Sequence, residues 1–389
     1  MRKKAGVQMA KVSMKTRQEI IKRYEAAYRK AIKKEKGRIL DMICESTGIS
    51  RSRAKHILTQ APKPKKRKPG RKPKYDILFV AALEKMWSYM DFACGRRLVA
   101  GMEDMLTSLA VHGEVCFSPE ITDKLKTVSA PTVDRLLVKA KTGLAFKGKS
   151  TTKPGTLLKR DIPVRMGSEW DDAVPGFVEI DLVAHCGTTT AGDYVNTLDV
   201  TDICTGWTET QAVLNKAQRH VFTALLDIGN RQPFPYKGID SDNGSEFINA
   251  HLVNWCKKES IIFTRSRPYK KNDNCHVEQK NWHIIRRNIG YQRYEGQAAA
   301  DAMNDYYALL RLYSNFFLPQ TKLIAKIRVG ARIRKRYDTP KTPYRRAMES
   351  GYITPEAKFA LQETYVSLNP AALQRDMAFA LDRLLSHGI

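Results

Sequence analysis

The chain has 389 residues, of which 42% are hydrophobic, and its formal net charge is +27. This length suggests two to four domains, and the apolar content is enough for folded cores, which excludes a disordered chain. No run of about 18 apolar residues occurs, so we expect no membrane span. The basic N-terminus lacks an apolar segment, so we do not expect it to be a secretory signal.

Cysteine usage and charge distribution narrow the class of protein. The seven cysteines are scattered and form no C-x-x-C pair, which favours free thiols and a cytoplasmic location. Residues 1–75 hold 25 Lys and Arg against 5 Asp and Glu, so most of the excess charge lies there. Such a basic segment indicates a polyanionic partner, and nucleic acid is the commonest one.

The first 60 residues predict a helix-turn-helix DNA-binding region. Residues 15–32 have apolar side chains at helical spacing, and "GRILDMICES" continues the pattern. "TGIS" then provides a turn, with Ser50 as the N-cap of a second helix. Arg51, Arg53 and Lys55 open that helix and are candidate DNA contacts. A small helical hairpin without a DNA-binding role is the alternative.

Residues 61–75 predict an extended basic linker, because four prolines and eight Lys or Arg oppose both helix and strand. "KPGRKPK" also resembles a short hook for the DNA minor groove. Arg67, Arg71 and Lys72 are then candidate DNA contacts. A plain charged linker explains the composition equally well.

Residues 76–142 predict a second helical domain that resembles a helix-turn-helix. Ser118-Pro119 and Ser129-Ala130-Pro131 are two helix starts separated by a short helix. Arg135 and Lys139 then face outward as candidate DNA contacts. Residues 143–167 have little periodicity and are expected to be a linker.

From residue 168 the pattern changes to strands, and the element order β-β-β-α-β-α-β-α predicts a mixed α/β layer fold. Antiparallel strands come first, and parallel strands alternating with helices follow. We place this domain at 168–300 and expect 301–389 to be a basic, mainly helical C-terminal extension.

Three carboxylates fall at informative places in these elements. Asp181 lies within the first strand, Asp242 follows a later strand, and Glu278 lies in the first turns of a helix. Oxygen ligands from separate elements in a basic protein favour Mg²⁺ or Mn²⁺, with two ions sharing one phosphate. The individual alternatives are an ion pair, an Asx turn and a solvated helix surface. A calcium loop is excluded, because the twelfth residue from Asp240 is His251.

Taken together, "VEIDLVAH", "IDSDNGSEF" and "YKKNDNCHVEQKNW", with 35 residues between Asp242 and Glu278, resemble the retroviral-integrase-like DDE transposases of bacterial insertion sequences. The resemblance implies an RNase-H-like core with Asp181, Asp242 and Glu278 as the catalytic, metal-binding triad. It gives no ligand role to Asp240 and no catalytic role to Glu246.

The implied function is a transposase that binds transposon ends, cleaves phosphodiesters and transfers the freed 3′-OH to target DNA. Its partners are double-stranded DNA and further copies of itself in the DNA complex at the nucleoid, and a helper ATPase is left open. Lys270, Lys271 and Lys280 are candidate phosphate contacts. The alternatives are a DNA-binding regulator or inactive remnant, and a nuclease that only hydrolyses.

Overall fold

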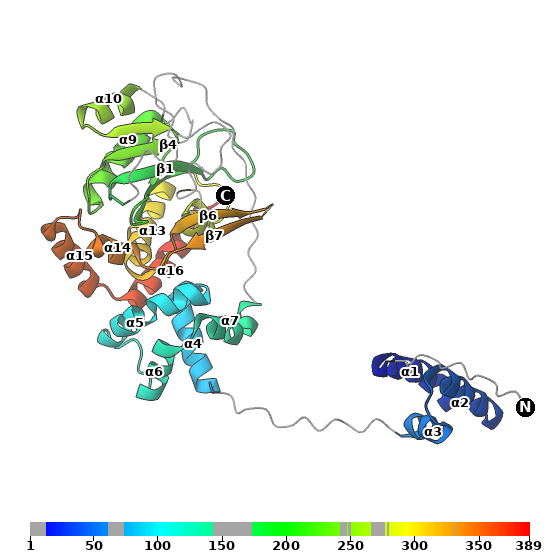
Figure 1. The fold of residues 1–389 in the computed structure, drawn as a ribbon. Helices are drawn as coiled ribbons and strands as arrows, with labels where there is room; N and C mark the ends of the chain where they lie inside the picture. The colour runs from blue at the N-terminus through cyan, green and yellow to red at the C-terminus, as the bar shows by residue number, and fades with distance from the viewer. Residues whose placement is uncertain are drawn as a thin grey trace, which may run out of the picture. The chain divides into compact units, whose positions relative to one another are not determined.

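The structure is a computed structural model, and it divides the chain into two compact units, residues 1–74 and 75–389 (Figure 1). Each unit is described by itself. No helix in the described part of the chain is both long and apolar enough to cross a bilayer. The described residues are 13–60, 74–142, 173–241, 247, 250–265, 277, 280–330 and 332–389.

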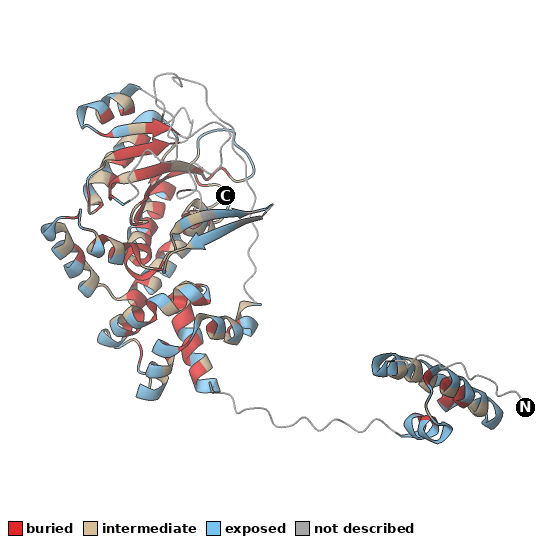
Figure 2. Cartoon of the chain, in the orientation of Figure 1, coloured by how far each residue is buried: buried red, intermediate tan, exposed pale blue. Residues whose placement is uncertain are grey.

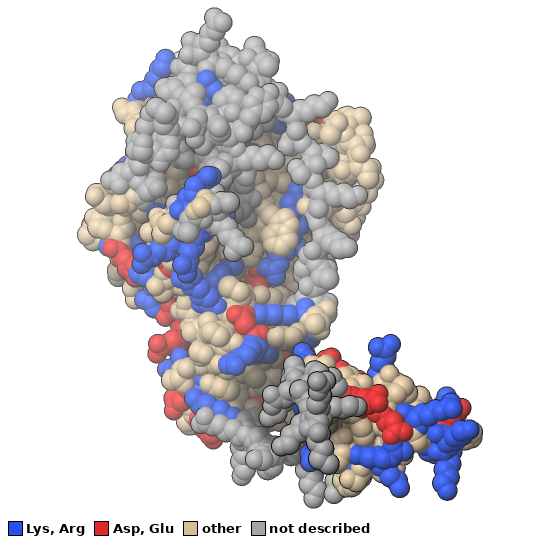
Figure 3. Space-filling view, turned by 45° about the vertical axis from the view of Figure 1, so that its right-hand side comes forward, with Lys and Arg blue, Asp and Glu red and all other residues tan. Residues whose placement is uncertain are grey.

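The described part of the smaller unit, residues 13–60 and 74, contains three helices around a small apolar core that includes Tyr28, Ile43 and Leu58. Gly48 ends the second helix with φ 70°, and Ser50 Oγ accepts a hydrogen bond from the backbone N–H of Arg53. The predicted turn and cap are therefore present. Lys and Arg stand out on the visible face of this unit (Figure 3). The helices are α1 (Met14–Lys30), α2 (Lys33–Thr47) and α3 (Arg51–Thr59).

The larger unit is built on a five-stranded sheet with the order β3-β2-β1-β4-β5. The pairs β1–β2 and β2–β3 are antiparallel, whereas β1–β4 and β4–β5 are parallel. This confirms the mixed sheet that the sequence predicts. The strands are β1 (Phe177–Ala184), β2 (Asn196–Asp202), β3 (Thr208–Val213), β4 (Gly238–Ser241) and β5 (Ile262–Arg265).

Helices cover both faces of this sheet (Figures 1 and 2). One face packs on α9 and α10 through a cluster that includes Ile180, Val200 and Leu225. The other face meets a second cluster, in which Val183 packs with Ile285 and Met303. Burial on both faces explains why β2 is buried along its whole length. The covering helices are α9 (Gln218–Arg231), α10 (Ala250–Lys258), the π-helix η1 (Asn281–Arg286), α12 (Arg287–Ile289) and α13 (Gly296–Phe317).

Helix α9 continues through Gly229 and Asn230 and ends at Arg231. Gly229 serves packing instead of a helix cap, because a Cβ there would lie 2.7 Å from Cε2 of Tyr236. Arg231, the last residue of the helix, donates from Nε to Oε2 of Glu209 at 3.0 Å.

The helices of residues 77–141 share one hydrophobic cluster with the C-terminal part of the chain. Phe79 and Leu98 belong to the same cluster as Phe316, Tyr344 and Leu373. This region therefore packs as part of the larger unit. The helices are α4 (Ile77–Tyr89), α5 (Gly95–Val111), α6 (Pro119–Thr127), α7 (Ala130–Leu136) and α8 (Val138–Lys141).

A β-hairpin precedes the last three helices. It lies within residues 301–389, which the sequence predicts to be basic and mainly helical. Each of these helices starts with proline after a polar cap, namely Thr342, Thr354 or Asn369. The elements are β6 (Leu323–Val329), β7 (Arg332–Tyr337), α14 (Pro343–Glu349), α15 (Pro355–Ser367) and α16 (Pro370–Leu385).

Candidate active site

Four carboxylates share one face of the sheet. Glu179 and Asp181 are two positions apart on β1, so their side chains point to the same side. Asp181 pairs with Asp199 on β2, and Glu179 pairs with Asp240 on β4. Paired residues in a sheet project to one face, so this face gathers acidic side chains from three neighbouring strands.

Burial distinguishes Asp181 from the other three. Glu179, Asp199 and Asp240 are fully buried, whereas Asp181 is partly exposed. Asp240 Oδ1 accepts a hydrogen bond of 2.5 Å from Thr264 Oγ1. Asp240 is therefore held inside the sheet, and Asp181 is the carboxylate of this set that solvent and a ligand can reach.

Burial and neighbouring carboxylates both raise the pKa of Asp199 on this face. Burial raises the pKa of Asp199, the nearby Lys280 amine opposes the rise, and Asp181 and Glu179 add to it. Thr201 Oγ1 donates to Asp199 Oδ1 at 3.0 Å. An acidic cluster of this kind calls for positive charge from a lysine or a bound cation.

Val277 and Asn281 each contact a carboxylate of β1. The backbone N–H of Val277 donates to Glu179 Oε2 at 3.1 Å. Nδ2 of Asn281 donates to Asp181 Oδ2 at 2.5 Å. Val277, directly before Glu278, and Asn281, three positions after it, are therefore bound to the carboxylate face, and Glu278 itself lies outside the described residues.

Asp242 also lies outside the described residues, but the pairing next to it is clear. The parallel register of β1 and β4 runs to Ile180 and Ser241. The following residues in the chain are Asp181 and Asp242. The strands thus bring the residue before each expected ligand into a directly paired position.

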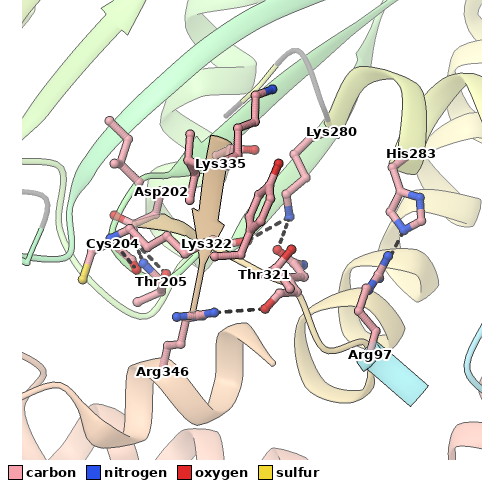
Figure 4. A pocket seen from close by; sticks show the side chains of 16 residues that line it. Arg97, Asp202, Cys204, Thr205, Lys280, His283, Thr321, Lys322, Lys335 and Arg346 are labelled. Atoms are coloured by element: carbon pink, nitrogen blue, oxygen red, sulfur yellow. Dashed lines mark hydrogen bonds between the residues drawn. The ribbon is translucent and has the colours of Figure 1, made fainter. Parts of the chain in front are cut away.

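Lys280 lies beside the carboxylates and lines a cavity (Figure 4). Its amine donates to the carbonyl of Gly206 at 3.1 Å and to Gln320 Oε1 at 2.6 Å. Burial lowers the pKa of this amine, and the charge of Asp199 opposes the fall. A phosphate contact by Lys280 would therefore come from a partly buried position and not from the open surface.

The other expected DNA contacts that can be placed are exposed. Arg51 forms an ion pair with Asp41 and donates to the carbonyl of Gly37 at 3.3 Å, so its charge is already engaged. The remaining exposed members are Arg53, Lys55, Arg135 and Lys139, and the expected contacts that lie outside the described residues are Arg67, Arg71, Lys72, Lys270 and Lys271.

Two residues of this site do not emerge from the sequence motifs. Asn281 stands three positions after Glu278, a spacing that places two side chains on one side of a helix, and this was the available signal. Asp199 had a weaker signal, because its place opposite Asp181 depends on strand register, which the motif does not give.

The donor set fits a hard divalent cation. Asp199 Oδ2 and Asn281 Oδ1 are buried and have no hydrogen-bond partner within the described part of the chain. With the accessible carboxylate of Asp181 they provide oxygen donors, which Mg²⁺ prefers. The described residues alone contain no close group of three acidic, His or Cys ligands, so a complete site needs Asp242 and Glu278.

Comparisons with known proteins find a family model and relatives that are similar to this chain. The family model of the integrase core domain matches residues 171–271. The "Uncharacterized protein y4rM" of Sinorhizobium fredii (strain NBRC 101917 / NGR234) is 39% identical over 342 residues, or 86% of this chain and 96% of that protein.

Two solved structures are similar at lower identity. The catalytic core domain of BIV integrase is 18% identical, with a TM-score of 0.28, and the match covers 44% of this chain and 91% of that one. The HTLV-2 integrase catalytic core domain, in complex with magnesium in a dimeric form, is 13% identical with a TM-score of 0.30. That match covers 39% of this chain and 94% of the other.

Proposed function

This chain belongs to the integrase-like (DDE) transposases, and we propose that it binds the ends of a mobile DNA element, cleaves them and joins them to target DNA. The observation that carries the proposal is the pairing of Ile180 with Ser241, directly before Asp181 and Asp242. The two contacts of the Val277–Asn281 segment with β1 support the same placement for Glu278.

In this proposal Asp181, Asp242 and Glu278 hold two Mg²⁺ or Mn²⁺ ions. When bound, such ions stabilise the attacking and leaving oxygens of a phosphoryl transfer. Asn281 orients the Asp181 carboxylate through its hydrogen bond. Asp240 keeps a structural role, because its carboxylate is buried and bonded to Thr264.

The reaction has two displacement steps at phosphorus. In the first, a water oxygen forms a bond to phosphorus, the bond to the 3′ oxygen breaks, and a 3′-OH and a 5′-phosphate are released. In the second, that 3′-OH attacks a phosphodiester of target DNA and a target 3′-OH leaves. Each step exchanges one P–O bond for another, so no external energy source is required by the bond balance.

DNA recognition is assigned in this proposal to the basic surfaces. The exposed Arg53 and Lys55 on α3 present positive charge in the manner of a recognition helix. Arg135 and Lys139 would add contacts from the α7–α8 region. Because two ends must be cut and joined together, we expect several copies of the chain in the complex, in the cytoplasm at the nucleoid. The need for a helper ATPase is a question for reconstitution.

The test is a cleavage and strand-joining assay on labelled candidate ends with Mg²⁺ or Mn²⁺. We expect Asp181→Asn, Asp242→Ala and Glu278→Gln each to abolish both steps while DNA binding persists. Cleavage by a folded Asp242→Ala variant would overturn the metal assignment. A wild-type chain that binds but neither cuts nor joins would be a regulator, and one that cuts without joining would be a nuclease.

A further inference from the structure

A cavity of about 260 Å³ lies beside the carboxylate face in the larger unit. One water needs roughly 10–15 Å³ by the same measure, so the cavity is large enough for a group much bigger than water. Residues from α5, the β2–β3 turn, β7, α14 and the Lys280–His283 segment line it. Figure 4 shows Arg97, Lys280 and Arg346 entering this region from different elements.

The lining is strongly basic. Hydrogen bonds fix two of its guanidinium groups: Arg97 Nε donates to the carbonyl of Pro319 at 2.5 Å, and Arg346 Nη2 to that of Gln320 at 3.0 Å. Arg346 also pairs with Asp338 at 2.7 Å. Fixed cations form a preorganised anion site more readily than mobile surface lysines. The basic lining residues are Arg97, Lys280, Lys322, Lys335 and Arg346.

Asp202 is the carboxylate among these described lining residues, and its oxygens are already engaged. Oδ1 accepts from the backbone N–H of Gly176 at 2.8 Å. Oδ2 accepts from the backbone N–H and the hydroxyl of Thr205 at 2.7 and 2.6 Å. Burial raises the pKa of Asp202 to about 6. Asp202 therefore stabilises its own turn, and of the five basic groups Lys322 is the one whose charge acts on it.

Strand β7 turns one set of its side chains toward this cavity. Lys335 and Tyr337 line it, whereas the alternate residues Arg334 and Arg336 do not, although Lys335 is exposed like both arginines. This alternation follows from strand geometry. It also provides two arginines on the same strand as a control for the effect of charge alone.

The cavity adjoins the reacting groups. Lys280 lines it and directly precedes Asn281, whose amide binds Asp181. Thr201 lines it as well, and its hydroxyl donates to Asp199. An anion held here would lie next to the carboxylate face without occupying it.

We propose that this cavity binds a backbone phosphate of the DNA strand that is cut, next to the scissile phosphodiester. The inference rests on the proposed function and deepens it, because it assigns a strand-positioning role to Lys322, Lys335, Arg97 and Arg346. Phosphate contacts fix the register of a protein on DNA, and a phosphate held beside the metal site would fix which bond is cleaved.

The binding test compares the full chain carrying Lys322→Gln and Lys335→Gln with a matched Arg334→Gln and Arg336→Gln variant. The probe is a fluorescently labelled duplex of candidate end sequence, measured by anisotropy over a range of salt concentrations. We expect the cavity variant to lose roughly tenfold in affinity and the log–log salt slope to fall by about 1.8, or ~0.9 per contact. Equal losses in both variants would overturn the proposal.

A second arm locates the phosphate on the DNA. Single phosphates near the cleavage point are replaced one at a time by neutral methylphosphonates. At one position we expect the methylphosphonate to weaken DNA binding by the wild type but not to weaken binding by the cavity variant any further. The two changes are then non-additive, as expected when the altered lysines contact that phosphate. The inference is wrong if no phosphate position behaves in this way with the double variant or with the exposed Lys335→Gln single variant.

Two further readouts separate this idea from its competitors. If inorganic phosphate or thymidine monophosphate occupies the cavity at millimolar concentration while DNA affinity is identical in wild type and variant, the site serves a free nucleotide and the proposal fails. Cleavage by the wild type and its loss in Asp181→Asn test the proposed function independently of the cavity. Thermal unfolding of each variant checks that the fold is retained.

Discussion

Asn281 Nδ2 donates a 2.5 Å hydrogen bond to Asp181 Oδ2, linking the π-helical segment to the accessible carboxylate of the sheet. The amide can bind Asp181 only while η1 keeps its position over β1. π-Helical turns are rare and frequent at functional sites, and here the turn begins at the residue that makes this contact. Asn281 is thus a positioning residue for Asp181.

Asn281→Ala should lower the cleavage rate about 10–100-fold, since residues that orient metal ligands have effects of this size. The loss should be partly restored by raising the Mg²⁺ concentration, because the carboxylate remains but is poorly oriented. Single-turnover cleavage over a metal titration measures both. Asn288→Ala is the control, because its amide binds only the carbonyl of Ile284. An unchanged metal dependence in Asn281→Ala would contradict the assignment.

Asp240→Asn should keep cleavage within about tenfold of wild type, because an amide oxygen can still accept the hydrogen bond from Thr264. Asp240→Ala leaves that hydroxyl buried without its acceptor and should cost about 1–3 kcal/mol of unfolding free energy. Urea unfolding and the cleavage assay give the two quantities. Complete loss of cleavage in a folded Asp240→Asn variant would mean that Asp240, and not only Asp181, takes part in the reaction.

Histidine 185 should make the larger unit sensitive to acid. It is fully buried, its Nε2 lies 2.7 Å from Thr197 Oγ1, and burial and the Arg286 charge lower its pKa to about 3. The unfolded chain binds a proton near pH 6.5 and the folded chain does not. The contribution of the neutral His185 side chain to the unfolding free energy is therefore present above pH 6.5 and is lost as the pH falls toward 3.

Between pH 6.5 and 4.5 this loss should reach roughly 2–3 kcal/mol of unfolding free energy. His185→Gln has no charge to gain, so its unfolding free energy should vary less with pH over this window. His251→Gln, at an exposed position on α10, serves as the control and should follow the wild type. Parallel pH profiles for wild type and His185→Gln would refute the prediction.

On α3, Arg53→Gln with Lys55→Gln should weaken DNA binding and reduce the log–log salt slope by about 1.8. Arg51 is left in place because it pairs with Asp41, so its removal would also break that contact. The matched control is Lys22→Gln with Arg23→Gln, an exposed pair on α1. If the two double variants lose affinity and slope equally, α3 has no special role in DNA binding.

Local patterns predict the elements of the sheet and the place of Asp181 because strand alternation and helix caps act over a few residues. The two helix starts at Ser118 and Ser129 are confirmed for the same reason. The contact of Asp181 with Asn281 needs tertiary packing, and the position of Asp199 needs strand register. The motifs around the three expected ligands determine neither the tertiary packing nor the strand register.

The β6–β7 hairpin was missed because its strands are dominated by basic residues. In "KIRVGARIRKRY" several apolar and charged side chains alternate, but the high charge favours the interpretation as a basic, mainly helical extension. Gly330, with φ 59°, lies between the strands. The cavity was out of reach for a different reason, since Arg97 and Arg346 are far apart in sequence and meet only in the folded chain.

The common hydrophobic cluster of Phe79, Leu98, Phe316 and Tyr344 has a consequence for dissecting this protein. A fragment cut at residues 168 and 300, the bounds expected for the catalytic domain, would divide α13 and remove Met303, which packs with Val183 and Ile285. Such a fragment would aggregate instead of folding. The unit that keeps this cluster whole runs from Tyr75 to the last helix, so the sheet and the C-terminal helices should be expressed together.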